Sequence, residues 1–251
     1  MQILGVIPAR YASTRFPGKP LVDIFGKPMI QHVYEKAVQV LPHAVVATDD
    51  ARIFDAVEAF GGQVVMTDKN HQSGTDRCAE AVGIFEANTN IKIDAVINIQ
   101  GDEPFIKTSQ IEQLAKLLIK NDVQIATLIK AIEQNDNLFN PNNVKVVIGE
   151  NNEALYFSRQ PIPYFRGNEE KDWLKKHNYY KHIGLYGYKI DTLKQITKLN
   201  KGKLELAESL EQLRWLENNY KITTAETYIE GIGIDTPEDL EIALKTQAEK
   251  L

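Results

Sequence analysis

The sequence predicts an α/β fold with a central mixed, mostly parallel sheet and a small β-rich lobe. In the first half of the chain, short apolar runs alternate with segments of helical periodicity, which is typical of a parallel sheet covered by helices. In the second half, several strand-like runs follow one another without a helix between each pair. The sheet is therefore expected to become mixed there, or to gain a small lobe of strands.

The elements of the first half follow from these two patterns. The expected strands are short apolar runs, at 3–9, 44–48, 63–66 and 94–99. The expected helices have apolar side chains three or four residues apart, at 29–41, 53–60 and 74–85. Ser109 and Glu112 have the spacing of a capping box, so they predict the start of a further helix.

The second half is expected to contain more strands than helices. The predicted strands lie at 125–132, 144–148, 154–157, 183–188 and 228–235. Residues 159–181 contain prolines, aromatic residues and a charged stretch, and predict a long surface loop. Leucines between Leu206 and Leu216 predict one helix, and Thr236-Pro237 has the residues that begin another.

The composition is that of one large domain, or of one domain with a smaller lobe. Of the 251 residues, 43% are apolar and 25% are charged, which is enough for a full core. The formal net charge is −5, so no overall positive field would attract nucleic acid or an anionic membrane, and neither is expected as a partner. An anionic ligand would therefore depend on local cations.

The protein is expected to be cytoplasmic. Cys78 is the only cysteine, which excludes an intramolecular disulfide and fits a reducing compartment. The first apolar run has no basic stretch before it and is too short for a signal peptide. No run reaches the roughly 18 to 20 apolar residues that a bilayer span requires.

The segment after the first strand has the residues of a polyphosphate site. Arg10, Arg15 and Lys19 fall close together behind a predicted buried strand, among small and turn-forming residues that let the backbone approach a ligand. Pro17 and Pro20 stiffen the chain on either side of Gly18-Lys19. The alternative is a solvated connection whose arginines form surface ion pairs.

Two carboxylates are predicted to share a site with these cations. Asp102 and Asp235 each follow a hydrophobic run just before a turn that contains proline, and ligands of open α/β sheets bind outside the carboxyl ends of the strands. Two carboxylates beside a polyphosphate repel it unless a cation lies between them, so the pair indicates a magnesium site. Alternatively, Asp102 forms a turn and Asp235 supports the last helix.

Two common nucleotide motifs are absent from the sequence. There is no G-x-x-x-x-G-K-[ST], and the first strand does not lead into G-x-G-x-x-G. A Walker-type ATPase and a dinucleotide oxidoreductase are therefore not indicated, whereas nucleotidyl transfer remains open.

Seven segments, in order along the whole chain, closely resemble the 3-deoxy-manno-octulosonate cytidylyltransferases, the CMP-Kdo synthetases of Gram-negative bacteria. They lie at 10–21, 71–77, 100–104, 156–159, 182–188, 209–214 and 235–240. Members of this family transfer CMP from CTP to the anomeric hydroxyl of Kdo for lipopolysaccharide assembly. The resemblance implies a three-layer fold like that of nucleotide-diphospho-sugar transferases, and a homodimer. It implies a single domain over 1–251, with a sugar-binding and dimerisation lobe within about 125–225.

The resemblance also implies the roles of individual residues. Arg10, Ser13 and Lys19 would bind CTP, with Arg10 and Lys19 acting in catalysis, and Asp102 and Asp235 would be catalytic ligands of Mg²⁺. The implied sugar-binding residues are Arg77, Gln100, Arg159, His182, Tyr186, Glu211 and Gln212. Of these, Arg77 and Arg159 are candidates for the carboxylate of Kdo, since a guanidinium suits a carboxylate.

Several alternatives remain open from the sequence. Relatives that activate 8-amino-Kdo share much of the pattern. Sialic-acid cytidylyltransferases lack the Pro-Gly-Lys-Pro-Leu segment found here at 17–21, and sugar-1-phosphate nucleotidyltransferases open with G-x-G-T-R. A non-catalytic nucleotide-binding module has less need of two metal-binding carboxylates. How cytosine is selected is not indicated, although Thr48 and Asp49 follow the second strand, where Asp49 is also a candidate helix cap.

Overall fold

The computed structural model describes residues 1–229, 231 and 233–248, and divides the chain into two compact units. The first unit comprises Met1–Glu112 and Gly231–Leu251, and the second comprises Gln113–Glu230. The chain thus leaves the first unit, forms the second and returns to the first.

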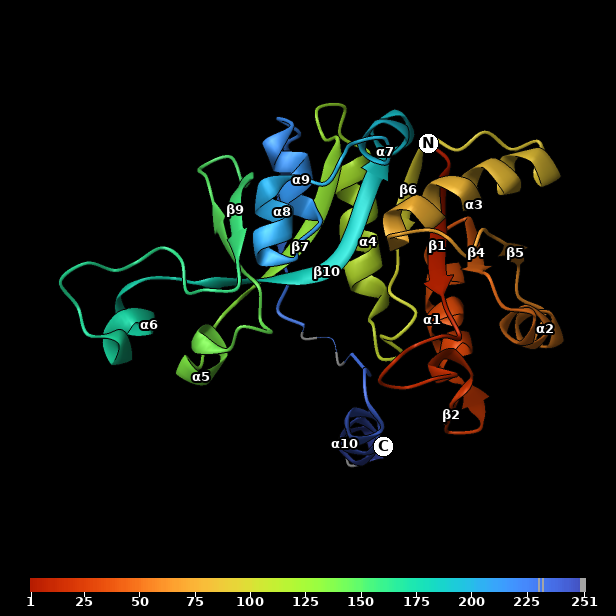
Figure 1. The fold of residues 1–251 in the computed structure, drawn as a ribbon, viewed down its shortest axis with the longest axis horizontal. Coiled ribbons are helices and arrows are strands. Elements are labelled where there is room, and N and C mark those ends of the chain that lie inside the picture. The colour runs from red at the N-terminus through yellow and green to blue at the C-terminus, as the bar shows by residue number, and fades with distance from the viewer. Residues whose placement is uncertain (230, 232, 249–251) are drawn as a thin grey trace. The chain divides into compact units, whose positions relative to one another are not determined.

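The first unit contains a parallel sheet, as the alternation of apolar runs and helices predicts. Its strands lie in the order β6-β1-β4-β5, and all neighbours are parallel (Figure 1). Their bounds are Ile3–Ala9 for β1, His43–Thr48 for β4, Val64–Met66 for β5 and Ala95–Asn98 for β6. Every residue of β6 is buried, as expected for strands covered on both faces.

Three helices pack against these strands: α1 at Met29–Val38, α2 at Ala51–Ala59 and α3 at Gly74–Thr89. Helix α2 begins at Asp50, whose side chain accepts from the Arg52 amide. Helix α3 begins in a capping box formed by Ser73 and Asp76. The capping box predicted from Ser109 is wrong, because α4 (Thr108–Leu118) has already begun before that residue. Lys19–Leu21 forms a short 3₁₀ helix, and Asp23–Ile24 (β2) pairs with Lys27–Pro28 (β3).

The returning segment of the first unit ends in helix α10, Pro237–Ala248. Ala243 packs with Ile24, Met29 and Ile234 in a buried cluster. The strand predicted at 228–235 is wrong: none of the described residues there is in a strand, and residues 230 and 232 lie outside the described residues. The amide of Ile234 donates to the carbonyl of Asp102 at 2.9 Å, which ties this segment to the residues that follow β6.

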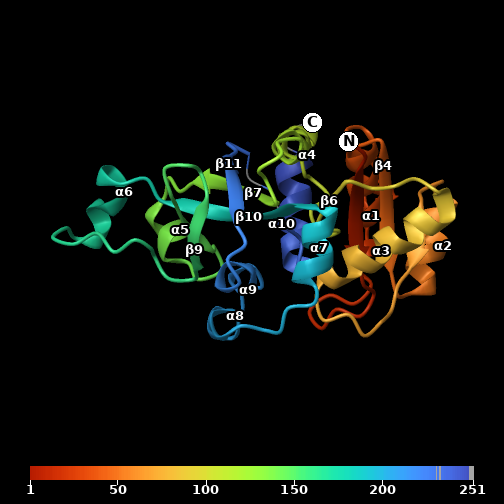
Figure 2. The same ribbon diagram turned by 90° about the horizontal axis from the view of Figure 1, so that it is seen from above.

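The second unit contains a mixed sheet, which confirms the change in pattern predicted for the second half (Figure 2). Strand β7 pairs parallel with β11 and antiparallel with β10, while β8 pairs antiparallel with β10 and β9. The bounds are Ile125–Ala131 for β7, Lys145–Ile148 for β8, Ala154–Ser158 for β9, Tyr180–Lys189 for β10 and Ile222–Glu226 for β11.

The helices of the second unit are short. They are α5 at Asn135–Phe139, α6 at Trp173–Lys176, α7 at Ile190–Ile196, α8 at Lys203–Glu208 and α9 at Gln212–Glu217, with a 3₁₀ turn at Glu170–Asp172. The single helix predicted between Leu206 and Leu216 is therefore two helices. Ser209 separates them, because its φ of 53° is left-handed and cannot continue an α-helix.

Candidate functional site

The first unit contains a pocket of about 450 Å³ at the carboxyl ends of its strands. The loop after β1 forms one part of its wall, the start of α3 another, and the segment after β6 a third. Its lining includes seven of the residues singled out from the sequence: Arg10, Ser13, Arg15, Lys19, Arg77, Gln100 and Asp102. Segments that are far apart in the sequence therefore meet at one site.

The loop from Arg10 to Gly18 is closed on itself by backbone hydrogen bonds. The Tyr11 carbonyl accepts from the amides of Ser13 and Gly18, both at 3.0 Å. Gly18 has a φ of 74°, a conformation that glycine adopts at little cost. This turn directs the chain into the 3₁₀ helix that begins at Lys19. The Lys19 side chain therefore extends from backbone that follows directly on a hydrogen-bonded turn.

Lys19 joins the two predicted metal ligands. Its Nζ lies 2.8 Å from Asp102 Oδ2 and 3.0 Å from Asp235 Oδ1. Arg15 adds a second cation, with Nη2 3.0 Å from Asp235 Oδ2. The Lys19 side chain is only 12% exposed, so water screens its ammonium charge less than it would at an open surface.

The charges of this cluster shift the pKa values of its members. Partial burial acts to lower the pKa of Lys19, but the two carboxylates outweigh it and raise that pKa above its usual value. Desolvation acts to raise the pKa of Asp235, but Lys19 and Arg15 outweigh it and hold that pKa below its usual range. Lys19 and Asp235 are therefore both charged at neutral pH.

Asp102 and Asp235 are held by backbone contacts beside their side chains. The Ile234 amide donates to the Asp102 carbonyl, and the Asp239 carboxylate accepts from the amides of Asp235 and Thr236. Gly101 is required by close approach, because a Cβ there would lie 2.8 Å from the carbonyl oxygen of Pro8. The two carboxylates therefore face Lys19 from a fixed backbone.

The carboxylates of Asp102 and Asp235 fit a divalent cation whose remaining ligands come from a substrate. Among the residues that the structure describes, no group of three or more His, Cys, Asp or Glu side chains is placed to hold a metal ion. Asp102 and Asp235 nevertheless converge on one positive charge, the Lys19 ammonium. Mg²⁺ at nucleotide sites is usually bound by one or two protein carboxylates, and substrate phosphates and water supply the other ligands.

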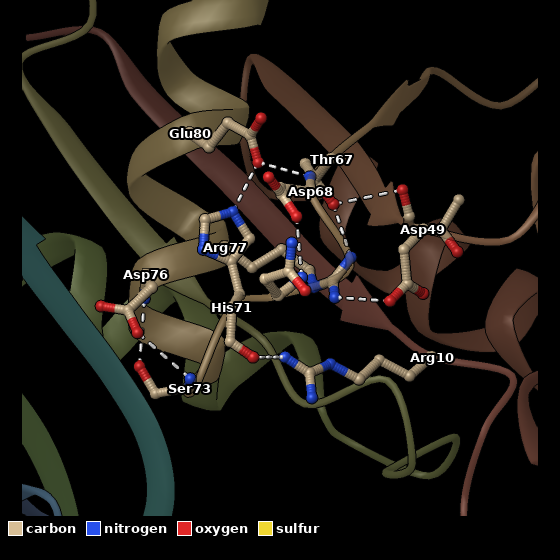
Figure 3. Close-up of polar contacts among 11 residues, drawn as sticks. Arg10, Asp49, Thr67, Asp68, His71, Ser73, Asp76, Arg77 and Glu80 are labelled. Carbon is tan, nitrogen blue, oxygen red and sulfur yellow. Dashed lines mark hydrogen bonds and ion pairs between the residues drawn. The ribbon is translucent and has the colours of Figure 1, made fainter.

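Arg77 lines the pocket and belongs to a network of polar contacts with neighbouring side chains (Figure 3). It extends from α3, and its guanidinium donates to Thr67 and, at 3.0 Å, to Asp49. Arg77 is fully buried, and its Nε has no hydrogen-bond partner among the described residues. Arg10 donates to the carbonyl of His71 in the segment before the same helix.

Five of the predicted sugar-binding residues lie in the second unit. The guanidinium of Arg159 donates to the backbone carbonyls of Pro141, Glu208 and Ser209. Gln212 is buried at the start of α9, and Glu211 lies 3.8 Å from Arg214. Their predicted roles, like those of the first-unit residues, stay predictions.

His182 and Tyr186 come together through a bulge in β10. Four residues of a regular strand span about 13 Å, but the register shifts between Ile183 and Tyr186, and the two rings lie 5.0 Å apart. Burial lowers the pKa of His182 to about 3. Burial, together with the charge of Glu211, raises the pKa of Tyr186 well above its usual value. The Tyr186 hydroxyl is buried without a hydrogen-bond partner among the described residues.

Two residues of the site were not assigned from the sequence. Arg15 was recognised as part of the cationic loop but was not placed against Asp235. Asp49 does not cap α2, which Asp50 does, and instead pairs with Arg77. Asp49 and Asp50 are adjacent and chemically identical, so the sequence held no signal to separate them.

The chain is similar in sequence and in fold to known cytidylyltransferases. A family model described as Cytidylyltransferase matches residues 4–222. A 3-deoxy-manno-octulosonate cytidylyltransferase of Parabacteroides distasonis is 58% identical over 248 residues, 97% of each chain. An enzyme of the same name from Phocaeicola vulgatus is 56% identical over 96% of this chain and 95% of its own. A solved structure of a CMP:2-keto-3-deoxy-manno-octonic acid synthetase complexed with CTP matches with a TM-score of 0.91 and 44% identity, over 100% of both chains. This match confirms the predicted fold class.

No helix in the described part of the chain is long and apolar enough to cross a bilayer.

The low pKa of His182 predicts that stability falls as the solution is acidified. An unfolded histidine gains a proton below about pH 6.5, whereas His182 in the folded protein gains one only near pH 3. Between these values the unfolded state binds more protons, so the wild type loses stability by up to about 1.4 kcal/mol per pH unit through this residue. Urea unfolding at several pH values from 7 to 4 measures the slope.

The comparison variant is His182→Gln, which lacks the titrating group. Its stability should fall less steeply over the same range. Equal slopes, or an NMR titration of His182 with a midpoint near pH 6.5, would contradict the prediction.

Proposed function

The chain belongs to the 3-deoxy-manno-octulosonate cytidylyltransferases, and we propose that it transfers CMP from CTP to the anomeric C2 hydroxyl of 3-deoxy-manno-octulosonate (Kdo), releasing pyrophosphate. One feature of the site supports this proposal most directly. Lys19 contacts both Asp102 and Asp235 at the edge of a pocket that Arg10 and Arg15 also line. A binding module has little use for two carboxylates beside a polyphosphate, whereas nucleotidyl transfer requires charge at that point.

The cationic loop would bind the triphosphate. Arg10 and Lys19 supply positive charge to its oxygens, and Ser13 offers a hydroxyl from the same loop. Because the loop is closed by its own backbone hydrogen bonds, these groups are positioned before the nucleotide arrives. We extend this role to Arg15, which lines the same pocket.

Asp102 and Asp235 would hold Mg²⁺ together with oxygens of the triphosphate. When bound there, the ion supplies positive charge that lowers the pKa of the attacking hydroxyl and neutralises the leaving pyrophosphate. The fixed backbone at both carboxylates keeps them in place for this ligation.

The reaction forms one P–O bond and breaks another. The C2 oxygen of Kdo attacks the α-phosphorus in line, the bond from that phosphorus to the oxygen bridging to the β-phosphate breaks and leaves its electron pair on pyrophosphate, and the hydroxyl proton passes to solvent water. Lys19 stabilises the negative charge that spreads over the phosphate oxygens in the transition state. No side-chain nucleophile is required.

The sugar would be recognised by the polar side chains that the family resemblance implies. Gln100, His182, Glu211 and Gln212 are proposed to contact its hydroxyls. Tyr186 is also proposed to contact a sugar hydroxyl, because its own buried hydroxyl has no hydrogen-bond partner in the part of the chain that the structure describes. Arg77 and Arg159 are the two proposed partners of the Kdo carboxylate.

We also propose that the protein is a cytoplasmic homodimer whose product enters lipopolysaccharide synthesis. The membership of the family supports these three points. Light scattering of the purified protein should give about twice the chain mass of 28.4 kDa. A mass equal to one chain would contradict the dimer.

The transfer itself is tested by pyrophosphate release. We expect release from CTP only when Kdo and Mg²⁺ are both present, because the acceptor oxygen and the charge at Asp102 and Asp235 are both needed. A panel of CTP, UTP and ATP against Kdo, 8-amino-Kdo and sialic acid identifies the donor and the acceptor. No release with CTP, Kdo and Mg²⁺ would refute the transferase, and a clear preference for 8-amino-Kdo or sialic acid would refute the assignment of Kdo.

The role of Asp235 is tested by Asp235→Asn, which keeps the size of the side chain and removes its charge. Turnover should fall by about a thousandfold or more, because the variant loses one of two carboxylates at the reacting phosphate. Asp55→Asn is a matched control, since Asp55 is exposed on α2 and does not line the pocket. Circular dichroism and thermal unfolding check that both variants fold. Near-normal turnover of folded Asp235→Asn would remove Asp235 from the metal site.

A further inference from the structure

We propose that Arg52, which does not line the pocket, is a positioning residue that holds the loop carrying Arg10 and Lys19 in its binding conformation. The inference rests on the proposed function, because it assigns a task to a loop that is proposed to bind the triphosphate of CTP. Its basis is a series of contacts that leads from the start of α2 to Gly18.

Tyr11 is the residue around which this loop closes. Its carbonyl accepts from the amides of Ser13 and Gly18. Its ring packs directly on Gly18, because a Cβ built there would lie only 3.1 Å from the ring. The position of the Tyr11 ring therefore affects the residue immediately before Lys19.

Arg52 covers the Tyr11 ring. The central carbon of its guanidinium lies 3.3 Å from the ring centroid, in contact distance for a stacked cation–π pair. Neither Arg52 nor Tyr11 is among the residues that line the pocket, and the contact of the guanidinium is with the Tyr11 ring of the loop.

Asp50 fixes the guanidinium from the other side. Its two carboxylate oxygens accept from Arg52 Nε at 2.9 Å and Nη2 at 2.6 Å. The same carboxylate caps α2 by accepting from the Arg52 amide at 3.0 Å. Asp50 thus ties the stacked guanidinium to a helix that packs against the sheet.

These contacts matter because residues 10–18 form neither a helix nor a strand. A loop without such support samples more conformations, and binding the triphosphate would then have to order it. Loss of the stacking should weaken CTP binding while leaving the chemical step in the bound complex largely unchanged. The loss of one cation–π contact at an exposed site corresponds to a rise in the Kd for CTP of about two- to fivefold.

The experiment measures CTP binding by calorimetry, without Kdo, for the wild type and six variants. Arg52→Ala should raise the Kd about fivefold, and Arg52→Lys should recover little of this, because an ammonium cannot form the two parallel hydrogen bonds to Asp50. In steady-state assays the KM for CTP should rise while kcat stays within about twofold of the wild type. Lys92→Ala is the control, since it removes the same charge from an exposed residue of the first unit.

Asp50→Asn distinguishes two explanations for an effect of Arg52 on CTP binding. Arg52 either positions the loop or attracts the triphosphate directly through its charge. Asparagine caps helices as well as aspartate does, so α2 is retained, but the ionic contact with Arg52 is weakened. Removing a negative charge near a triphosphate would by itself tighten CTP binding. Positioning predicts the opposite, a Kd about twofold to threefold higher.

A double-mutant cycle tests whether Arg52 acts through Tyr11. Tyr11→Leu should weaken binding, and adding Arg52→Ala to it should have little further effect, because the partner ring is already absent. Additive effects would overturn the proposal. So would wild-type Kd values in Arg52→Ala, full retention in Arg52→Lys, or tighter binding in Asp50→Asn.

Hydrogen exchange distinguishes failure of this inference from failure of the proposed function. The Gly18 amide, which donates to Tyr11, should exchange faster in Arg52→Ala than in the wild type without any ligand. Unchanged exchange would refute the positioning role. Faster exchange in a protein that does not bind CTP would retain that role and reject the proposed function.

Discussion

The site depends on a cation that two carboxylates share. Lys19, Asp102 and Asp235 come from distant parts of the chain, yet Lys19 Nζ lies within 3.0 Å of a carboxylate oxygen of each aspartate. Two carboxylates so close to one another would repel strongly without that charge. The loop after β1, the segment after β6 and the backbone before α10 must therefore all be in place together.

This arrangement suits a ligand that carries both negative oxygens and a divalent cation. Lys19 and Arg15 offset the charges of Asp102 and Asp235, and Arg10 adds a further positive charge to the pocket lining. A triphosphate with Mg²⁺ would give the carboxylates a new counter-ion and Lys19 new oxygens to contact. We propose that the charges of the site are matched to the nucleotide and its metal ion in combination.

The sequence predicted the strands of the first unit well, because buried parallel strands are apolar throughout and helices separate them. The sequence predicts that Asp235 lies near Asp102 for a reason that is wrong, since none of the described residues at 228–235 is in a strand. Its position comes from the contact of Ile234 with Asp102 and from Asp239, which no local pattern reveals. The break at Ser209 and the pairing of Asp49 with Arg77 were likewise hidden, because they depend on backbone conformation and on which segments meet.

The first unit is interrupted in sequence by the second, and this order has a consequence for protein synthesis. A ribosome that has made residues 1–112 has produced the sheet and the cationic loop, but not Asp235. The nascent polypeptide therefore carries a lysine that lacks one of its two anionic partners until residues 113–235 have followed. The loop is synthesised early, and the second carboxylate that pairs with Lys19 is added only when translation reaches Asp235, just before α10.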